Sequence, residues 1–140
     1  LRGLRTLDVR LKRHEENTKK IINFLKNEKK IKEILYPHKK GTQNYENWKK
    51  HYSGATGLFS VFIYSKNRNS ILKFVDSLKL FGIGQSWGGF ESLVLYQNHN
   101  LERVYKKYIK VNHHIVRFHI GLEDPVDLIA DLKQALKKIK

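Results

Sequence analysis

The chain has 140 residues, of which 40% are hydrophobic and 29% charged, as expected for a single globular domain. It contains neither cysteine nor methionine, so disulfides, thiolate metal sites and cysteine nucleophiles are excluded. A formal charge of +15 raises the possibility of a nucleic-acid-binding protein, but the lysines are scattered in pairs rather than gathered in one run, which favours a general bias in composition.

The sequence also indicates where in the cell the protein is expected and whether the chain is part of a longer protein. No run of about 18 apolar residues could span a membrane, and the N-terminal residues are too highly charged for a signal peptide. We therefore expect a cytoplasmic protein. Because the chain lacks methionine, we expect it to be a fragment of a longer protein or one piece of a split gene.

The first predicted element is a long amphipathic helix over about residues 4–27. Its apolar positions recur at helical spacing; they are Leu4, Leu7, Leu11, Thr18, Ile21, Phe24 and Leu25. His14 lies on the same stripe, and we interpret it as a packed or interfacial side chain rather than a metal ligand.

Residues 31–140 are predicted to form an α/β sandwich. A short strand over Lys32–Tyr36 is stopped by Pro37. Residues 38–51 are interpreted as a polar loop with a single helical turn, anchored to the core by Trp48. A strand over Gly57–Tyr64 and a helix over Ser70–Leu80, with Ser70 as its N-cap, follow.

The C-terminal third is predicted to contain two more strands and a final helix. The strands are Ser92–Tyr96 and Ile115–Ile120, with a short helix over Leu101–Tyr108 between them. Asp124 is a candidate N-cap and Pro125 suits the first turn of a last helix that reaches Ile139. This order predicts an α+β fold, in which helices pack on one face of a sheet.

Arg117 is the first candidate functional residue. Side chains alternate along a strand, so Val116, Phe118 and Ile120 should face the helices, while Ile115, Arg117 and His119 face the other way. A charge within an otherwise apolar strand needs a partner, and the guanidinium fork suits a carboxylate. The carboxylate could belong to a ligand or to an internal partner, with Glu91, Glu123 and Asp124 as candidates; the residues alone favour neither.

The stretch FGIGQSWGGFESLVL, residues 81–95, is the second candidate. Gly82, Gly84, Gly88 and Gly89 indicate special backbone geometry or a close approach. The stretch lacks the Gly-Lys-Ser of a phosphate loop and does not match the dinucleotide fingerprint. From turn chemistry alone, a tight connection between strands is the favoured explanation.

A family resemblance adds to this reading. FGIGQSWGGFESL, followed by RFHIGLEDPVDLIADL, resembles the C-terminal part of the cystathionine β-lyases, within the Cys/Met-metabolism family of pyridoxal-phosphate enzymes. RGLRTLDVRLKRHEEN and GLFSVFI are similar to the same family, so the resemblance covers nearly the whole chain.

The resemblance implies both a fold and an activity. The fold is the small C-terminal domain of the aspartate-aminotransferase type (fold type I), with an antiparallel-rich sheet. The activity is β-elimination of cystathionine to homocysteine, pyruvate and ammonia in transsulfuration and methionine biosynthesis. It also implies that Arg117 binds the substrate's α-carboxylate, that Ser86 and Trp87 line the same pocket, and that the glycines let the backbone turn around the bound amino acid. It implies no metal.

Two departures from the family pattern bear on activity. Gln85 stands where the β-lyases usually have tyrosine, and an amide neither stacks nor ionises. The family's Schiff-base lysine, in a Lys-Tyr context followed by Gly-His, is absent from these residues, as are the residues that cradle the cofactor's ring and phosphate. We therefore expect no catalytic residue and no bound cofactor in this chain alone, and no catalysis without an N-terminal cofactor domain.

These observations leave three candidate functions. The first is the C-terminal part of a cystathionine β-lyase, with an N-terminal cofactor domain as its partner. The second is a non-catalytic remnant of a split gene, with a binding or complementing role. The third, from composition only, is a basic nucleic-acid-binding protein. Because the family's homotetramers form mostly through the large domain, we expect the isolated chain to be a monomer or a weak dimer formed through its first helix.

Overall fold

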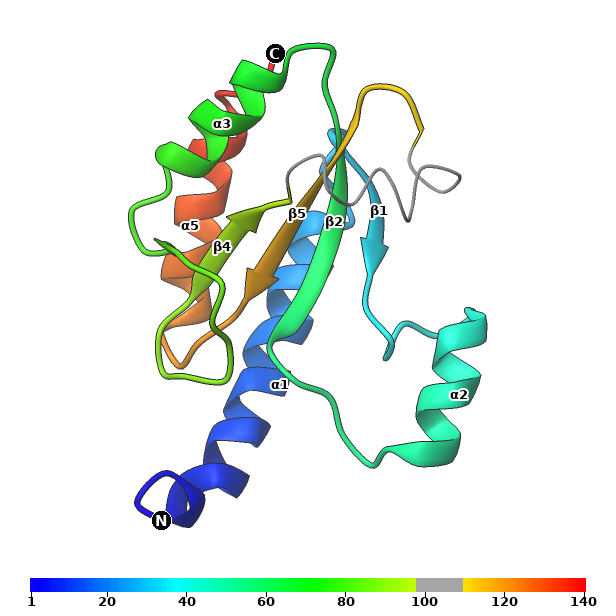
Figure 1. Ribbon diagram of the computed structural model, residues 1–140, viewed down its shortest axis with the longest axis vertical. Helices are drawn as coiled ribbons and strands as arrows, with labels where there is room; N and C mark the ends of the chain where they lie inside the picture. Colours follow the sequence, from blue (N-terminus) through cyan, green and yellow to red (C-terminus); the bar gives the residue numbers. More distant parts are fainter. Residues whose placement is uncertain (98–109) are drawn as a thin grey trace.

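The computed structural model describes residues 1–97 and 110–140 (Figure 1). The helices are η1 (Leu4–Thr6, a 3-10 turn), α1 (Leu7–Leu25), α2 (Gln43–His51), α3 (Arg68–Asp76) and α5 (Pro125–Leu136). The strands are β1 (Ile31–Leu35), β2 (Leu58–Tyr64), β3 (Gly82–Ile83), β4 (Leu93–Tyr96) and β5 (His113–His119). The helix expected over 101–108 lies outside the described residues.

The strands form one five-stranded sheet in the order β1-β2-β5-β4-β3. All neighbouring pairs are antiparallel except β3 and β4, which are parallel. The predicted antiparallel-rich α+β fold is therefore confirmed. Strand β5 lies at the centre of the sheet, with Arg117 opposite Ser60 of β2 on one side and Leu95 of β4 on the other.

The hydrophobic core lies between one face of this sheet and three helices. Val61, Val116 and Phe118 supply buried strand side chains, and α1, α3 and α5 cover them (Figure 1). Ile21, Phe74 and Leu128 contribute from the three helices in turn, each no more than 1% exposed. The predicted inward direction of alternate β5 residues is thus confirmed, and Arg117 belongs to the face that these helices do not cover.

Local sequence signals account for the ends of the last helix. The Asp124 carboxylate accepts a hydrogen bond from the Val126 N–H at 2.7 Å, and Pro125 occupies the first turn, as predicted. The helix ends at Leu136, three residues before the predicted end at Ile139. Beyond that end Ile139 is still buried, at 2% exposure, so its apolar character reflects core packing rather than helical conformation.

Three sequence-based expectations are wrong in detail. Residues 43–51 form a nine-residue helix rather than a single turn, because Thr42 caps it by accepting from the Tyr45 N–H. Trp48 donates to Gly54 O and packs on His38 within the same excursion, instead of anchoring it to the core. Asn67 caps α3, and Ser70 lies inside that helix with its hydroxyl 2.8 Å from that of Ser65. The short strand β3 within the glycine-rich stretch was not predicted.

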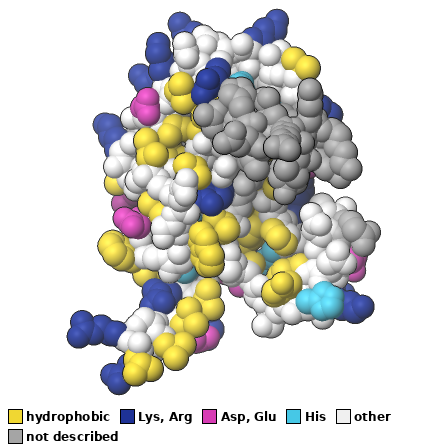
Figure 2. Space-filling model, in the orientation of Figure 1, with side chains coloured by type: hydrophobic (Ala, Val, Ile, Leu, Met, Phe, Trp, Pro, Cys, Tyr) yellow, Lys and Arg dark blue, Asp and Glu magenta, His cyan; other side chains and the backbone are white. Residues whose placement is uncertain are grey.

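The helices and the surface charges were compared with what a membrane protein or a nucleic-acid-binding protein would need. None of the helices within residues 1–97 and 110–140 is both long and apolar enough to cross a membrane. On the face that Figure 2 shows, Lys and Arg side chains lie in separate groups, most of them towards the edge, rather than in one patch. The same view shows hydrophobic side chains along the projecting start of α1, where Leu4 is 66% exposed.

Candidate functional site

The candidate site forms where the glycine-rich stretch crosses the open face of β5. Strand β3 pairs with β4, and the Gly82 and Gly84 N–H groups donate to Ser92 O and Val94 O. The chain between these pairings, residues 85–91, forms a loop. Gly88 has a φ of +83°, which favours glycine, whereas a Cβ at Gly89 would meet nothing within 4 Å. Of these two glycines, only Gly88 has a conformation that demands one.

Arg117 binds the start of this loop. Its Nη2 donates to the Gln85 carbonyl at 2.5 Å. Among the residues that the structure describes, Arg117 forms no ion pair, so the internal salt bridge considered above is not formed. The carboxylate of Glu123 instead accepts from Ser92, and that of Asp124 caps α5. Arg117 is half-buried as a residue, its bond to Gln85 O is exposed, and no carboxylate of the described chain forms an ion pair with it.

The contact with Gln85 uses its backbone carbonyl rather than its side chain. Any residue at this position supplies the same acceptor, so the replacement of the family's tyrosine leaves this hydrogen bond unaffected. The Gln85 side chain is exposed. The departure from the family pattern therefore affects only what that exposed side chain can contact.

Ser86 and Trp87 follow directly and are also exposed, Trp87 by 64%. Within the described residues neither side chain makes a hydrogen bond. The structure thus places all four predicted site residues around one loop, but only Arg117 and Gln85 touch by hydrogen bonding. Ser86 and Trp87 follow Gln85 in the loop with their side chains exposed to solvent.

His119 contacts the middle of the loop, at Gly88 and Gly89, which the sequence did not predict. The Gly88 nitrogen lies 3.1 Å from Nε2 and 3.5 Å from Nδ1 of His119, so its N–H points across the imidazole ring, and Nε2 lies 3.4 Å from Gly89 O. The ring is 2% exposed. Burial lowers the pKa of His119 below its ordinary value of 6.5, because the charged imidazolium loses hydration there. The lowered pKa favours the uncharged ring at neutral pH.

Two further glycines allow the chain to approach this histidine and the turn after it. A Cβ at Gly57 would lie 2.4 Å from Ile120 O and 2.9 Å from His119 Nδ1. A Cβ at Gly121 would lie 2.2 Å from Phe90 O. All three distances are below ordinary van der Waals contact, so at both positions only glycine fits without a shift of its neighbours. Neither close approach was predicted from the sequence, although Gly57 lies just before β2 and Gly121 lies shortly after β5.

Glu123 ties the end of the loop to the turn between β5 and α5. Its carboxylate accepts from Ser92 N at 2.6 Å and from Ser92 Oγ at 2.8 Å. Ser92 Oγ in turn accepts from Gly121 N, and Phe90 O accepts from Leu122 N at 2.8 Å. Residues 121–123, which directly follow Ile120, therefore hold residues 90–92 in place through several hydrogen bonds.

Helix α1 seals the same turn from the core side. His14 Nδ1 lies 2.6 Å from Ile120 O, and Asn17 Nδ2 donates to Gly121 O and Glu123 O. The His14 and His119 rings lie 5.0 Å apart, and His14 is 2% exposed. The prediction that His14 is a packed side chain is confirmed. No group of His, Asp and Glu in the described ranges could hold a metal ion.

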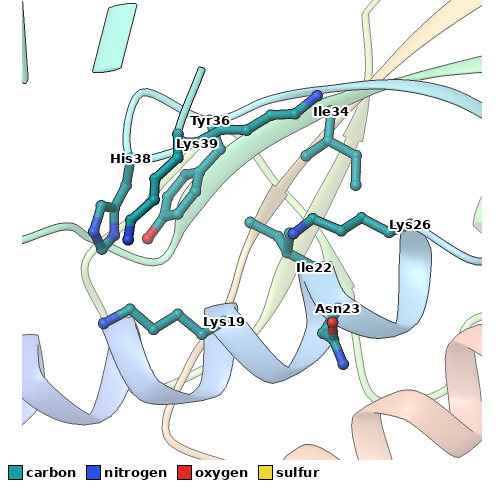
Figure 3. A pocket seen from close by; sticks show the side chains of 9 residues that line it. Lys19, Ile22, Asn23, Lys26, Ile34, Tyr36, His38 and Lys39 are labelled. Atoms are coloured by element: carbon teal, nitrogen blue, oxygen red, sulfur yellow. The ribbon is translucent and has the colours of Figure 1, made fainter. Parts of the chain in front are cut away.

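A separate hollow of about 610 Å³ lies between α1 and the chain around the end of β1 (Figure 3). Its apolar side consists of Ile22, Ile34 and Tyr36, and lysines including Lys26 and Lys39 surround it. None of the four predicted site residues lines it. It is therefore distinct from the arrangement around Arg117.

Comparisons with known proteins establish the family. The model of the Cys/Met metabolism PLP-dependent enzymes matches residues 1–137. The chain belongs to this family. Its fold is that of the small C-terminal domain of the fold-type I pyridoxal-phosphate enzymes, as a solved structure also shows. Cystathionine gamma synthase from Xanthomonas oryzae pv. oryzae, in complex with cystathionine, superposes with a TM-score of 0.84 at 26% identity, over 98% of this chain and 36% of that one.

Curated relatives carry more than one activity. The cystathionine beta-lyase of Escherichia coli (strain K12) is 37% identical over 99% of this chain and 36% of its own length. An L-alanine/L-glutamate racemase of Wolbachia pipientis wMel is 39% identical over 99% of this chain and 34% of its own length. The chain thus spans about a third of the length of these relatives.

Proposed function

We propose that this chain supplies the substrate-carboxylate side of the active site in a pyridoxal-phosphate-dependent cystathionine β-lyase. The reaction would consume water and convert cystathionine into homocysteine, pyruvate and ammonia. One observation carries the proposal. The guanidinium of Arg117 donates to the carbonyl of Gln85, next to Ser86 and Trp87, and has no carboxylate partner in the described chain. A bound amino acid would provide the missing negative charge.

In this proposal each of the four site residues has a role in binding the substrate. Arg117 would bind and orient the α-carboxylate, while its hydrogen bond to Gln85 O restricts the direction of its fork. Ser86 offers a hydroxyl beside the substrate. The exposed Trp87 ring would lose water on binding and close one side of the pocket. The Gln85 amide would face the part of the pocket where the family's tyrosine normally lies.

The residues around Arg117 fit a carboxylate, but they do not make a complete site for the cofactor. The loop residues 85–91 and the facing residues Arg117 and His119 include no lysine, and none of the chain's lysines has the family's Schiff-base context. In this family the cofactor acts as the electron sink, and the protein supplies orientation and electrostatics. We therefore infer that the cofactor and its lysine come from an N-terminal partner, in the same polypeptide or as a separate chain.

The deciding experiment uses the longest polypeptide that carries this chain, with any separately encoded N-terminal partner, purified with pyridoxal phosphate. Pyruvate release from cystathionine is compared between wild type and Arg117→Ala. We expect kcat/KM to fall by about a hundredfold to a thousandfold in the variant, since the carboxylate loses a charge-assisted partner. Arg117→Lys should recover only part of this, because an ammonium cannot form the bidentate pair.

Other outcomes separate the alternatives. Interconversion of alanine enantiomers without pyruvate would match the racemase relative instead of a β-lyase. Absence of both activities, together with no retained absorbance between about 400 and 430 nm after pyridoxal phosphate is added and the free cofactor is removed by dialysis, would indicate the non-catalytic remnant. Turnover by the 140 residues alone would contradict the assignment of this chain as part of an active site.

A further inference from the structure

The hollow between α1 and the end of β1 has core residues at its floor and cationic residues at its rim (Figure 3). Ile22 of α1 lies on one side, with Ile34 of β1 and Tyr36 on the other, and each of these three side chains is at most 8% exposed. The volume of about 610 Å³ lies within the range of small-molecule sites in proteins, roughly 300 to 1,000 Å³. The hollow therefore has the size and the apolar floor of a ligand site.

The charged residues that line this hollow are all basic. They include one histidine and four lysines but neither aspartate nor glutamate; the lysines are Lys19, Lys26, Lys39 and Lys40. Lys19 is already paired with Glu15, at 2.6 Å. Within residues 1–97 and 110–140, the ammonium groups of Lys26, Lys39 and Lys40 form no ion pair. Three positive charges at the edge of an apolar hollow thus have no counter-charge in the described chain, which favours an anionic ligand.

We propose that this hollow is a second ligand site, which binds a small organic carboxylate with an apolar chain. The apolar chain would lie on the floor, and the carboxylate would lie at the rim among the three unpaired lysines. A small inorganic anion would leave the apolar floor uncovered, and a neutral apolar molecule would leave the three charges unpaired. The proposal does not depend on the function proposed above, since neither Arg117 nor any residue of the loop 85–91 lines this hollow.

Contacts outside the hollow hold one of its walls in place. His38 belongs to this wall, and its ring packs on that of Trp48 with the centroids 4.2 Å apart. Its Nδ1 lies 3.7 Å from the carboxylate of Glu15 on α1. The Tyr36 hydroxyl donates to Thr56 O at 3.2 Å, which restricts the ring at the floor. These contacts tie the chain after β1 to α1 and α2, so a ligand would meet a largely preformed surface.

A smaller hollow near the end of α5 provides an internal comparison. Its volume is about 350 Å³, and the residues that line it are Lys30, Tyr64, Lys66, Ile139 and Lys140. The Lys30 ammonium already donates to the carbonyls of Leu136 and Ile139. This hollow therefore offers one aliphatic side chain and has one of its lysines bonded to the protein itself. Ile139 can report on unspecific association of the same ligand.

Calorimetry with octanoate tests the affinity, using the longest polypeptide that carries this chain. Octan-1-ol has the same chain length without the charge, and acetate has the charge without the chain. We expect octanoate to bind at least about tenfold more tightly than either. Hexanoate should bind about tenfold more weakly than octanoate, because it lacks two methylenes. Sodium chloride should weaken the binding of octanoate and leave that of octan-1-ol unchanged, since salt screens the charges at the rim.

Methyl spectra of the isoleucine-labelled 140-residue chain locate the bound octanoate. The signals of Ile22 and Ile34, which line the hollow, should shift. Those of Ile71, in the core on α3, and of Ile139 should stay in place. Shifts of equal size at Ile139 would overturn the proposal, as would equal affinities for octanoate and octan-1-ol. The absence of any shift at about 10 mM octanoate would also overturn it.

Two triple variants with the same change of charge provide the matched comparison. The first removes the charges at the rim and is Lys26→Gln, Lys39→Gln and Lys40→Gln; it should weaken octanoate binding by about tenfold. The second removes three exposed charges outside the hollow and is Lys20→Gln, Lys49→Gln and Lys50→Gln; it should change the affinity by less than about twofold. Equal weakening in both would overturn the proposal.

Arg117→Ala separates this site from the one proposed above, because a free guanidinium could also bind a carboxylate. Octanoate binding should be unchanged in this variant even where turnover of cystathionine is lost. If octanoate binding is lost with Arg117, the hollow is not the site and the proposal fails. If octanoate binds at Ile22 and Ile34 while Arg117→Ala leaves turnover intact, the second site stands and the proposed function fails alone.

Discussion

The two halves of α1 have the same amphipathic pattern and very different surroundings. Towards its C-terminal end, Ile21 and Leu25 are at most 1% exposed and pack into the core. Towards the N-terminus, Leu7 and Leu11 of α1 and Leu4 of the preceding turn η1 continue the stripe but are 39%, 39% and 66% exposed. Periodicity predicts which face of a helix is apolar. It does not tell whether another part of the same chain covers that face.

The transition between the halves coincides with the candidate site. His14 and Asn17 lie where α1 meets the turn after β5, and both bind backbone carbonyls of that turn. Beyond them, towards the N-terminus, the helix leaves the domain (Figure 1). The exposed stripe is the surface that an N-terminal cofactor domain or a second copy could cover in a longer protein.

The largest contrast is expected from truncating one apolar residue in each half. Ile21→Ala should lower the free energy of unfolding by about 2 to 5 kcal/mol, because it leaves a cavity in the core. Leu4→Ala should change it by less than about 0.5 kcal/mol, since little area is uncovered. Urea unfolding of both variants measures this. Equal losses would show that the projecting half is packed in solution.

A second contrast concerns the turn that α1 seals. Gly121→Ala would place a methyl 2.2 Å from Phe90 O and 2.6 Å from the carbonyl carbon of Glu91, and should destabilise by about 1 to 3 kcal/mol. Gly89→Ala, in the open part of the loop, should stay within about 0.5 kcal/mol. Thermal or urea unfolding distinguishes them. A neutral Gly121→Ala would contradict the close packing of residues 90–91 on this turn.

Asn17 tests the contacts of α1 more finely. Asn17→Ala removes two hydrogen bonds and leaves the buried carbonyls of Gly121 and Glu123 without these donors, for an expected loss of about 1 to 3 kcal/mol. Asn23→Ala is the same change at an exposed position of the same helix, where alanine's helix propensity should make it neutral or slightly stabilising. If the two variants lose the same stability, the link from α1 to the turn is unimportant.

The smallest effect on stability is expected from substitutions of the exposed leucines near the N-terminus, Leu4 and Leu11. The isolated chain should sediment as a monomer or a weak dimer, and replacing Leu4 and Leu11 by Gln should weaken any dimer without changing the free energy of unfolding by more than about 0.5 kcal/mol. Sedimentation at several concentrations measures the association. A stable tetramer of the 140 residues would refute the expectation.

Much of the fold could be predicted because its signals are local. The apolar spacing of α1, the alternation around Val116 and Phe118, and the Asp124–Pro125 cap depend on residues within a few positions of one another. The errors occurred where local cues compete. Asn67 and Ser70 are both good N-caps, and only the packing of α3 decides between them. Helix α2 has only two aromatic residues, Tyr45 and Trp48, among polar ones, so its hydrophobic pattern was too weak to indicate a helix.

The site was predictable in part for the same reason. The sequence by itself determined that Arg117 and His119 share one face of a strand, since side chains two residues apart point the same way. Only the tertiary structure decided that a loop 32 residues away supplies the carbonyl for Arg117, and that Gly88 rather than a side chain contacts His119. Backbone groups are alike at every position, so the bonds that shape this site leave no trace in residue identity except at the glycines that make room for them.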